Sequence, residues 1–130
     1  MLKRIGKGEG CRILVVEDDP SVRRALERVF RGAGYQAEFA INLQDGLAKL
    51  NEHHVVVLLD LHLSDGCGTT LLLRIRREAR PTRVAIYSGL IDAPAIVKAC
   101  GETPDAIFQK PVDFDQLLAW LTEVQASIRQ

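Results

Sequence analysis

Short apolar runs alternate with segments of helical periodicity along this chain. The runs occupy residues 11–16, 35–41, 55–63, 83–88 and 106–110. A continuous apolar run such as CRILVV (11–16) is typical of a strand that is covered on both faces. The second run, YQAEFAI, alternates between apolar and polar residues and predicts an edge strand. The third, VVVLLDLHL, is the most hydrophobic and predicts the central strand of a sheet.

The segment after the first run predicts a helix with clear ends. Its apolar face consists of residues three or four positions apart, namely Val22, Ala25, Leu26 and Val29. Asp19 precedes Pro20, a pattern typical of an N-cap followed by proline at the first helical position. Gly32 and Gly34 are expected to end the helix, because glycine tolerates the left-handed conformation common at helix C-termini.

Four further helices follow from similar signals. Asn42 is a candidate N-cap for a helix that reaches about residue 50, and the basic amphipathic segment 69–80 predicts a helix that ends before Pro81. Pro94 fits the first turn of a fourth helix. The last helix is expected from about Asp113. Between the third run and its helix, SDGCG is expected to be a glycine-containing loop.

Five β-α units in strict alternation predict an α/β fold with a parallel sheet and helices on both faces. For five strands and five helices, we expect the doubly wound, flavodoxin-like strand order 2-1-3-4-5. In such sheets, ligands bind outside the carboxyl ends of the strands, where the strand order reverses. A Rossmann nucleotide-binding fold is the alternative. The turn EDDP after the first strand lacks the glycine fingerprint of that fold, and its three carboxylates would repel a pyrophosphate.

Composition narrows the class of protein further. At 130 residues the chain is most simply one domain, and its 17 Lys and Arg residues balance its 17 Asp and Glu residues. This charge balance indicates neither a nucleic acid nor an anionic membrane as partner. No apolar run approaches the roughly 20 residues that a membrane span needs. Residues 1–10 contain basic residues but no apolar signal core, so we expect a flexible leader and no export.

The cysteines and a histidine pair carry no clear site in the sequence. Cys11, Cys67 and Cys100 are odd in number and far apart, which fits neither a disulfide framework nor a zinc site and favours reduced cytosolic thiols. His53 and His54 follow a predicted helix and have no third metal ligand nearby. They are expected to lie at a solvated helix end.

Polar residues follow the predicted strands at the same end of each. These residues are Glu17, Asp18, Asp60, Ser88 and Lys110. Because the carboxyl ends of parallel strands meet at one edge of the sheet, the five side chains are expected to converge there. Three carboxylates in one pocket need a counter-charge, and Mg²⁺ is the hard cation that oxygen ligands suit. Carboxylates, Mg²⁺, a lysine and a hydroxyl are the parts used to bind and transfer a phosphoryl group.

Four motifs carry a resemblance to a known family. They are ILVVEDDP (13–20), VVVLLDLHLSDGCG (55–68), VAIYSG (84–89) and FQKP (108–111). With these motifs, the chain resembles the receiver domain of two-component response regulators. The final helix extends the resemblance to all but the leader, so residues 11–130 are expected to form the receiver domain.

The resemblance implies a role for each residue at the strand ends. Asp60 would be the phosphoacceptor, and Lys110 would hold the acyl-phosphate oxygen. Glu17 and Asp18 would bind Mg²⁺ together with Asp60 and the backbone carbonyl of His62. The phosphoryl group would come from a phosphohistidine on a sensor histidine kinase or a phosphotransfer protein. The Lys110–Pro111 peptide bond is expected to be cis, as it often is in this family.

The resemblance also implies a conformational switch. Ser88 would move to bind the phosphoryl group and bias a surface formed by the fourth helix, the fifth strand and the fifth helix. Gly89 would leave room for the incoming donor. In the family, an aromatic residue three positions before the lysine turns inward in concert. Ile107 stands at that position, so we expect altered coupling, because isoleucine has less volume to exchange between inward and outward positions.

The implied protein is a cytoplasmic signalling module that catalyses its own phosphorylation and dephosphorylation but turns over no external metabolite. A homodimer through the switch surface is the implied assembly. One alternative is the receiver part of a longer DNA-binding transcriptional regulator, although this chain alone is not expected to bind DNA. Another is a receiver that docks partners without phosphate. A phosphatase or phosphotransferase with an aspartyl nucleophile is a third alternative, but the DLH sequence at Asp60 does not match the usual aspartate pair of such enzymes.

Overall fold

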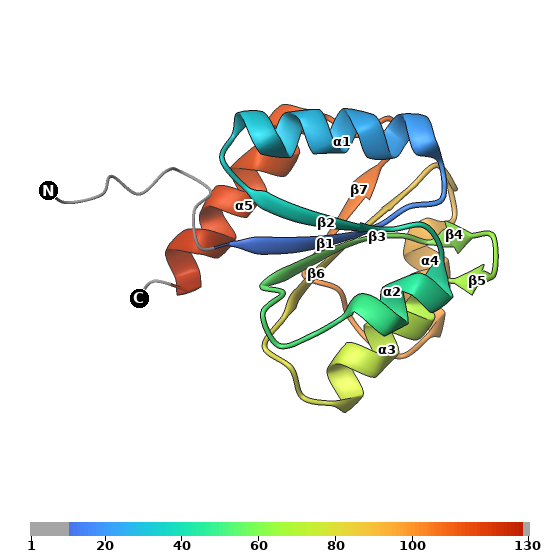
Figure 1. Ribbon diagram of the computed structural model, residues 1–130. Helices are drawn as coiled ribbons and strands as arrows, with labels where there is room; N and C mark the ends of the chain where they lie inside the picture. The colour runs from blue at the N-terminus through green and yellow to red at the C-terminus, as the bar shows by residue number, and fades with distance from the viewer. Residues whose placement is uncertain (1–10, 129–130) are drawn as a thin grey trace, which may run out of the picture.

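The computed structural model describes residues 11–128, which form a five-stranded parallel sheet between two layers of helices (Figure 1). The strands of this sheet are β1 (Arg12–Val16), β2 (Gln36–Ala40), β3 (Val56–Asp60), β6 (Arg83–Ser88) and β7 (Ala106–Gln109). Their order is β2-β1-β3-β6-β7, which confirms the doubly wound, flavodoxin-like arrangement. The central position of β3 and the edge position of β2 are also confirmed. The predicted leader, residues 1–10, lies outside the described residues.

Five helices cover the two faces of the sheet, as predicted. They are α1 (Pro20–Gly32), α2 (Leu43–Lys49), α3 (Thr69–Arg77), α4 (Ala93–Ala99) and α5 (Phe114–Ile128). Helices α1 and α5 lie on one face, and α2, α3 and α4 lie on the other (Figure 1). None of the helices within residues 11–128 is long and apolar enough to cross a membrane.

Each face of the sheet has its own hydrophobic core, because successive side chains of a strand point to opposite faces. In β3, Val56 and Leu58 pack toward α1 and α5, whereas Val57 and Leu59 pack toward the other three helices. All five residues of β3 are buried. This explains why the sequence of the central strand is uniformly apolar until Asp60.

The predicted helix caps are present. The side chain of Asp19 accepts a hydrogen bond from the Ser21 backbone N–H at 2.8 Å, directly ahead of Pro20. Asn42 accepts one from the Asp45 N–H at 2.8 Å. Helix α1 ends at Gly32, and Gly34 has a φ of 83°, the left-handed conformation expected after this helix. Local sequence signals therefore decided where these helices begin and end.

The predicted glycine-containing loop SDGCG (64–68) is not wholly irregular, because part of it is a strand. The segment after β3 forms a small antiparallel hairpin of β4 (His62–Leu63) and β5 (Gly66–Cys67). Asp65, at its turn, accepts hydrogen bonds from the backbone N–H groups of Leu43 at 2.7 Å and Gln44 at 2.9 Å. Two-residue strands are too short to produce a periodic signal. The anchor on α2 joins segments 22 residues apart, which local sequence does not encode.

Replacing Asp65 with alanine is expected to lower the melting temperature by a few degrees at neutral pH. The hydrogen bond from the Gln44 N–H lowers the pKa of Asp65 and outweighs its partial desolvation. An acid with a lowered pKa in the folded state stabilises the protein above its unfolded pKa of about 3.9, and that stabilisation is lost as the pH falls through the folded value. The difference between variant and wild type should therefore shrink in acid, which thermal unfolding across this pH range would measure.

Asp92→Ala is the matched control for this experiment, because Asp92 precedes α4 but makes no side-chain cap hydrogen bond. It should change the melting temperature little at any pH. A loss in Asp65→Ala that is no larger than in Asp92→Ala, or that persists unchanged in acid, would contradict the anchoring role.

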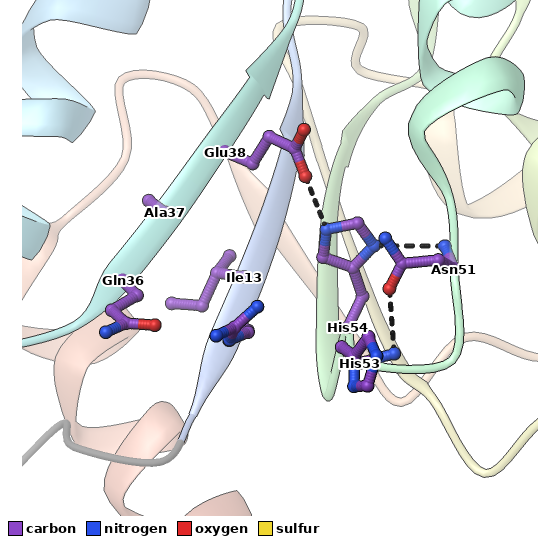
Figure 2. Close-up of a pocket in the computed structure, with 8 residues that line it drawn as sticks. Ile13, Gln36, Ala37, Glu38, Asn51, His53 and His54 are labelled. Carbon is purple, nitrogen blue, oxygen red and sulfur yellow. Dashed lines mark hydrogen bonds and ion pairs between the residues drawn. The ribbon is translucent and has the colours of Figure 1, made fainter.

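The expectation for the histidine pair was half wrong. His53 is exposed, but His54 is buried, with 4% of its surface accessible. Its Nε2 lies 2.9 Å from Glu38 Oε1, and its Nδ1 accepts the Asn51 backbone N–H at 3.2 Å, as Figure 2 shows. The imidazole therefore joins β2 to the turn before β3. The sequence places two adjacent histidines after a predicted helix. It does not indicate that His54 would contact Glu38 of β2.

The three cysteines are free, as predicted. Cys11 is buried, and burial raises the pKa of its thiol to about 11. Cys67 is exposed and Cys100 is half-buried.

Trp120 packs edge-on against Phe108, with ring centroids 6.0 Å apart, next to the core beneath α5.

Candidate functional site

The sheet brings the polar strand ends together at one edge. Asp60 is the last residue of β3, Ser88 is the last of β6, and Lys110 directly follows β7. The backbone N–H of Lys110 donates to the Ser88 carbonyl at 2.8 Å, which holds the ends of the last two strands in register. The Lys110–Pro111 peptide bond is cis, as the sequence resemblance implied.

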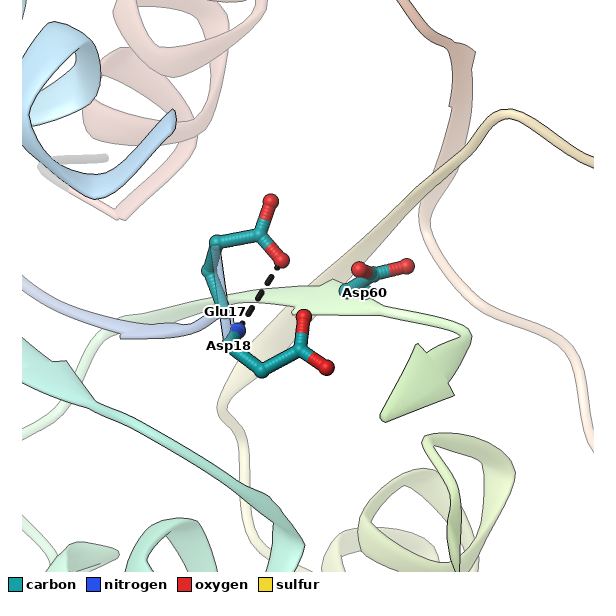
Figure 3. A group of neighbouring side chains, drawn as sticks. All are labelled: Glu17, Asp18 and Asp60. Atoms are coloured by element: carbon teal, nitrogen blue, oxygen red, sulfur yellow. Dashed lines mark hydrogen bonds between the residues drawn. The ribbon is translucent and has the colours of Figure 1, made fainter. Parts of the chain in front are cut away.

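Three carboxylates form a cluster at this edge. Glu17, Asp18 and Asp60 each offer an oxygen within 4.8 Å of the others, and Figure 3 shows them converging from the ends of β1 and β3. Glu17 is fully buried and Asp60 is 5% exposed. Glu17 Oε2 accepts the Asp18 backbone N–H at 3.0 Å. Asp19 takes no part in the cluster, because its side chain caps α1.

Lys110 supplies a positive charge inside the cluster. Its Nζ lies 2.9 Å from Glu17 Oε1 and 3.0 Å from Asp60 Oδ2. Burial acts to lower the pKa of Lys110, but the hydrogen bonds to Glu17 and Asp60 outweigh burial and raise it overall. Burial raises the pKa of Glu17, and Asp60 raises it further, against the opposing effect of Lys110. One lysine thus neutralises only part of the charge of three acids.

Because Gly68 has no side chain, the segment after Asp60 can pack closely against the end of β3. A Cβ on Gly68 would lie 2.3 Å from the Asp60 carbonyl oxygen, so only glycine fits there. The Gly68 N–H donates to the Leu61 carbonyl at 2.8 Å, and the His62 N–H donates to Asp60 Oδ1 at 3.1 Å. The Asp60 carboxylate is therefore oriented by its own chain as well as by Lys110. The expected role of the His62 carbonyl as a metal ligand stays a prediction.

The sequence reasoning did not identify two further residues at the site. Arg23 on α1 donates from Nη1 to the Glu17 carbonyl at 2.7 Å and so holds the turn that carries the first two acids. Tyr87 places its ring 4.7 Å from Lys110 Nζ. Helical periodicity places Arg23 one turn after Pro20, but no local signal indicates that either residue faces the cluster.

The residues expected to form the switch lie beside the cluster. Ser88 is buried, and its Oγ accepts the Leu90 backbone N–H at 3.0 Å. Ile107 faces outward with 41% of its surface exposed, in a hollow that it shares with Ser88, Leu90 and Ile91. A Cβ on Gly89 would meet only the Lys110 side chain, at 3.9 Å. The space beside Ser88 is therefore not crowded by neighbouring atoms.

The chemistry of this edge suits a divalent cation with oxygen ligands. The cluster offers carboxylate oxygens alone, which hard cations such as Mg²⁺ prefer, and it is the only such group of three within residues 11–128. Its excess negative charge favours cation binding over anion binding, and one divalent ion together with Lys110 would balance the three carboxylates. The arrangement can then hold a phosphoryl group next to Asp60.

Comparison with known proteins shows one consistent family. A family model described as the response regulator receiver domain matches residues 13–122. The acid tolerance regulatory protein ActR of Rhizobium meliloti is 32% identical over 119 residues, covering 89% of this chain and 60% of ActR. The cell cycle response regulator CtrA of Brucella abortus is 28% identical, covering 83% of this chain and 47% of CtrA. The chain thus spans between about half and 60% of these relatives.

Solved structures include one receiver domain above 25% identity and others that share the fold. A CheY-like response regulator receiver domain protein from Methanospirillum hungatei is 29% identical, with a TM-score of 0.78, covering 90% of this chain and 98% of that one. A two-component response regulator from Clostridium difficile has a TM-score of 0.82 at 21% identity, covering 92% of this chain and 99% of that one.

Proposed function

This chain belongs to the family of response regulator receiver domains of two-component systems, and we propose that Asp60 is its phosphoacceptor. The observation that carries the proposal is the position of Asp60 at the carboxyl end of the central strand. There its Oδ2 lies 3.0 Å from Lys110 Nζ, and two further acids offer oxygens within 4.8 Å. The proposed donor is a phosphohistidine on a histidine kinase or a phosphotransfer protein.

In the proposed reaction, an Asp60 carboxylate oxygen attacks phosphorus, and the phosphorus–nitrogen bond of the phosphohistidine breaks to leave an acyl phosphate on Asp60. Lys110 is already at Asp60 Oδ2 and would follow the negative charge onto the phosphoryl oxygens. Glu17, Asp18, Asp60 and the His62 carbonyl would hold Mg²⁺, which supplies charge neutralisation for the phosphoryl group when bound. Arg23 would keep Glu17 in place through its backbone carbonyl.

Ser88 is the proposed sensor of the phosphoryl group. A hydroxyl can accept one hydrogen bond and donate another, and Ser88 Oγ already accepts the Leu90 N–H. Donation to the phosphoryl group would therefore pull the loop ahead of α4 toward Asp60. Leu90 and Ile91 of this loop are exposed apolar side chains, and the exposed Ile107 lines the same hollow, so movement of the loop would change the apolar surface there. With isoleucine at position 107, the proposed coupling lacks the aromatic residue that the family uses.

The surface of α4, β7 and α5 is the proposed site for partners, including a second copy of this chain. We propose a cytoplasmic location for this chain, as is general for response regulators. The only reactions that this chain would catalyse are the phosphorylation and dephosphorylation of its own Asp60. ActR, CtrA and other relatives such as the transcriptional regulatory protein ZraR are longer than this chain, and a receiver within a longer transcriptional regulator stays the alternative proposal. The balanced charge of this chain does not favour nucleic acid binding by itself.

Intact mass after incubation with Mg²⁺ and acetyl phosphate is the direct test. We expect a gain of one phosphoryl group, and no gain when EDTA removes the metal. Reduction of the acyl phosphate with borohydride, followed by peptide mapping, should place the modification at Asp60. The metal dependence follows from the excess of carboxylates over cations in the cluster.

Two outcomes would change the proposal. Modification at a residue other than Asp60 would contradict the assignment of the phosphoacceptor. Absence of any adduct, with Mg²⁺ present and the protein folded, would favour a receiver that docks partners without phosphate.

A further inference from the structure

Tyr87 is a buried aromatic residue at the end of β6, next to the acidic cluster. Its side chain has no exposed surface, and it packs in the core beneath α1 and α5. In the sheet register, Tyr87 lies between Asp60 of β3 and Phe108 of β7. It is thus the direct neighbour of the proposed phosphoacceptor on the adjacent strand.

The ring of Tyr87 forms one wall of the space that holds the Lys110 ammonium group. Lys110 Nζ lies 4.7 Å from the ring centroid, within the range of a cation–π contact. The same atom lies 2.9 Å from Glu17 Oε1 and 3.0 Å from Asp60 Oδ2. A lysine side chain is flexible along four carbons, so contacts with two carboxylates do not by themselves determine where it lies. The ring provides a third contact for the same ammonium group.

The contact between Tyr87 and Lys110 that the structure shows is made by the ring. Among the described residues, the buried hydroxyl oxygen makes no hydrogen bond of ordinary geometry, although it lies near enough to Glu17 for that carboxylate to affect its pKa. Burial raises the pKa of Tyr87 far above its usual range, and the charges of Glu17 and Asp60 raise it further, so the side chain stays a neutral phenol. The interaction with Lys110 is therefore made by the ring, which phenylalanine would retain.

We propose that Tyr87 is a positioning residue that acts through Lys110, using its ring face to hold the ammonium group between Glu17 and Asp60. This inference rests on the proposed function, because holding the Lys110 ammonium group there is expected to raise the rate of phosphoryl transfer to Asp60. Without the ring, Lys110 keeps its charge but spends less time where negative charge develops.

The test compares Tyr87→Leu, which removes the ring, with Tyr87→Phe, which retains it. The rate of phosphoryl uptake from acetyl phosphate is expected to fall about five- to tenfold in Tyr87→Leu and less than about twofold in Tyr87→Phe, given the strength of a partly desolvated cation–π contact. Both changes are repeated in Lys110→Ala. There Tyr87→Leu should lower the rate by less than about twofold, since no ammonium group remains to be positioned.

A second readout is independent of phosphoryl transfer. In the proton NMR spectrum, the Lys110 ε-methylene signals should lie upfield from the ring current in wild type and Tyr87→Phe, and should return toward ordinary values in Tyr87→Leu. If wild type takes up no phosphoryl group, or if Lys110→Ala is too slow to measure, this shift decides whether the ring positions the lysine.

Three results would overturn the inference. One is an equal fall in rate for Tyr87→Leu with and without Lys110, which indicates a general packing defect. Another is a fall in Tyr87→Phe as large as in Tyr87→Leu. The third is an unshifted Lys110 ε-methylene signal in wild type.

Discussion

Replacing Asp60 with asparagine is expected to abolish phosphoryl uptake and to stabilise the metal-free protein. The amide of asparagine is not a nucleophile for phosphorus. Of the three acids in the cluster, Asp60 is the one that ends the central strand and contacts Lys110. The variant also removes one of three like charges that share the pocket. Relief of that repulsion, set against the lost contact with Lys110, should raise the free energy of unfolding by about 1 kcal/mol.

Intact mass and thermal unfolding, each with and without Mg²⁺, measure these two effects. Mg²⁺ should raise the melting temperature of wild type more than that of Asp60→Asn, because the variant replaces a proposed anionic metal ligand with a neutral amide. Asp19→Asn is the matched control. It replaces an acid that lies outside the cluster, in the turn that carries Glu17 and Asp18, and asparagine still caps α1, so phosphoryl uptake should be unchanged. Uptake that persists in Asp60→Asn would show that another residue is the acceptor.

Replacing Lys110 with methionine is expected to have the second large effect. It leaves the buried Glu17 and the nearly buried Asp60 without their cation. Loss of hydrogen bonds to charged, buried partners should lower the free energy of unfolding by about 2–3 kcal/mol at neutral pH. Phosphoryl uptake should slow roughly a hundredfold, the cost typical of losing one group that stabilises developing charge.

The pH dependence of Lys110→Met separates lost charge from lost packing. Burial raises the pKa of Glu17 above its usual value even with Lys110 present. An acid with a raised pKa in the folded state binds its proton more readily there, so stability rises as the pH falls through the folded pKa toward the unfolded value of about 4.3. Protonation of Glu17 would then replace the missing counter-charge, and the variant should approach wild type in mild acid.

Denaturant unfolding of wild type and variant from neutral pH to mild acid provides the measurement. Lys98→Met, on the exposed side of α4, is the matched loss of a lysine and should change stability little. A deficit in Lys110→Met that stays constant with pH would indicate that the aliphatic part of the side chain, and not its charge, stabilises the site.

Much of the fold was predictable because its signals are local. The strand runs, the period of the helix faces and the caps at Asp19 and Asn42 each act within a few residues. The convergence of Glu17, Asp18, Asp60, Ser88 and Lys110 was predictable for a different reason. Parallel strands must present their carboxyl ends at one edge, so the strand order brings these residues together once the alternation of strand and helix is established.

The errors and omissions share a physical cause. The β4–β5 hairpin, anchored by Asp65 to α2, and the burial of His54 against Glu38 both depend on contacts between separate segments. Gly68 looked like a loop glycine, although its lack of a side chain is required by the Asp60 carbonyl. Neither periodicity nor turn propensity reports such contacts.

The sequence by itself determined the order of elements, their faces and the set of polar residues at the strand ends. Only the tertiary structure decided which oxygens Lys110 contacts, because Glu17 and Asp60 lie 93 and 50 residues away from it along the chain. The same holds for the ring of Tyr87, which a local reading places in a strand core but packing places against an ammonium group. Local patterns specify backbone geometry, whereas the partners of a charged side chain depend on how distant segments pack.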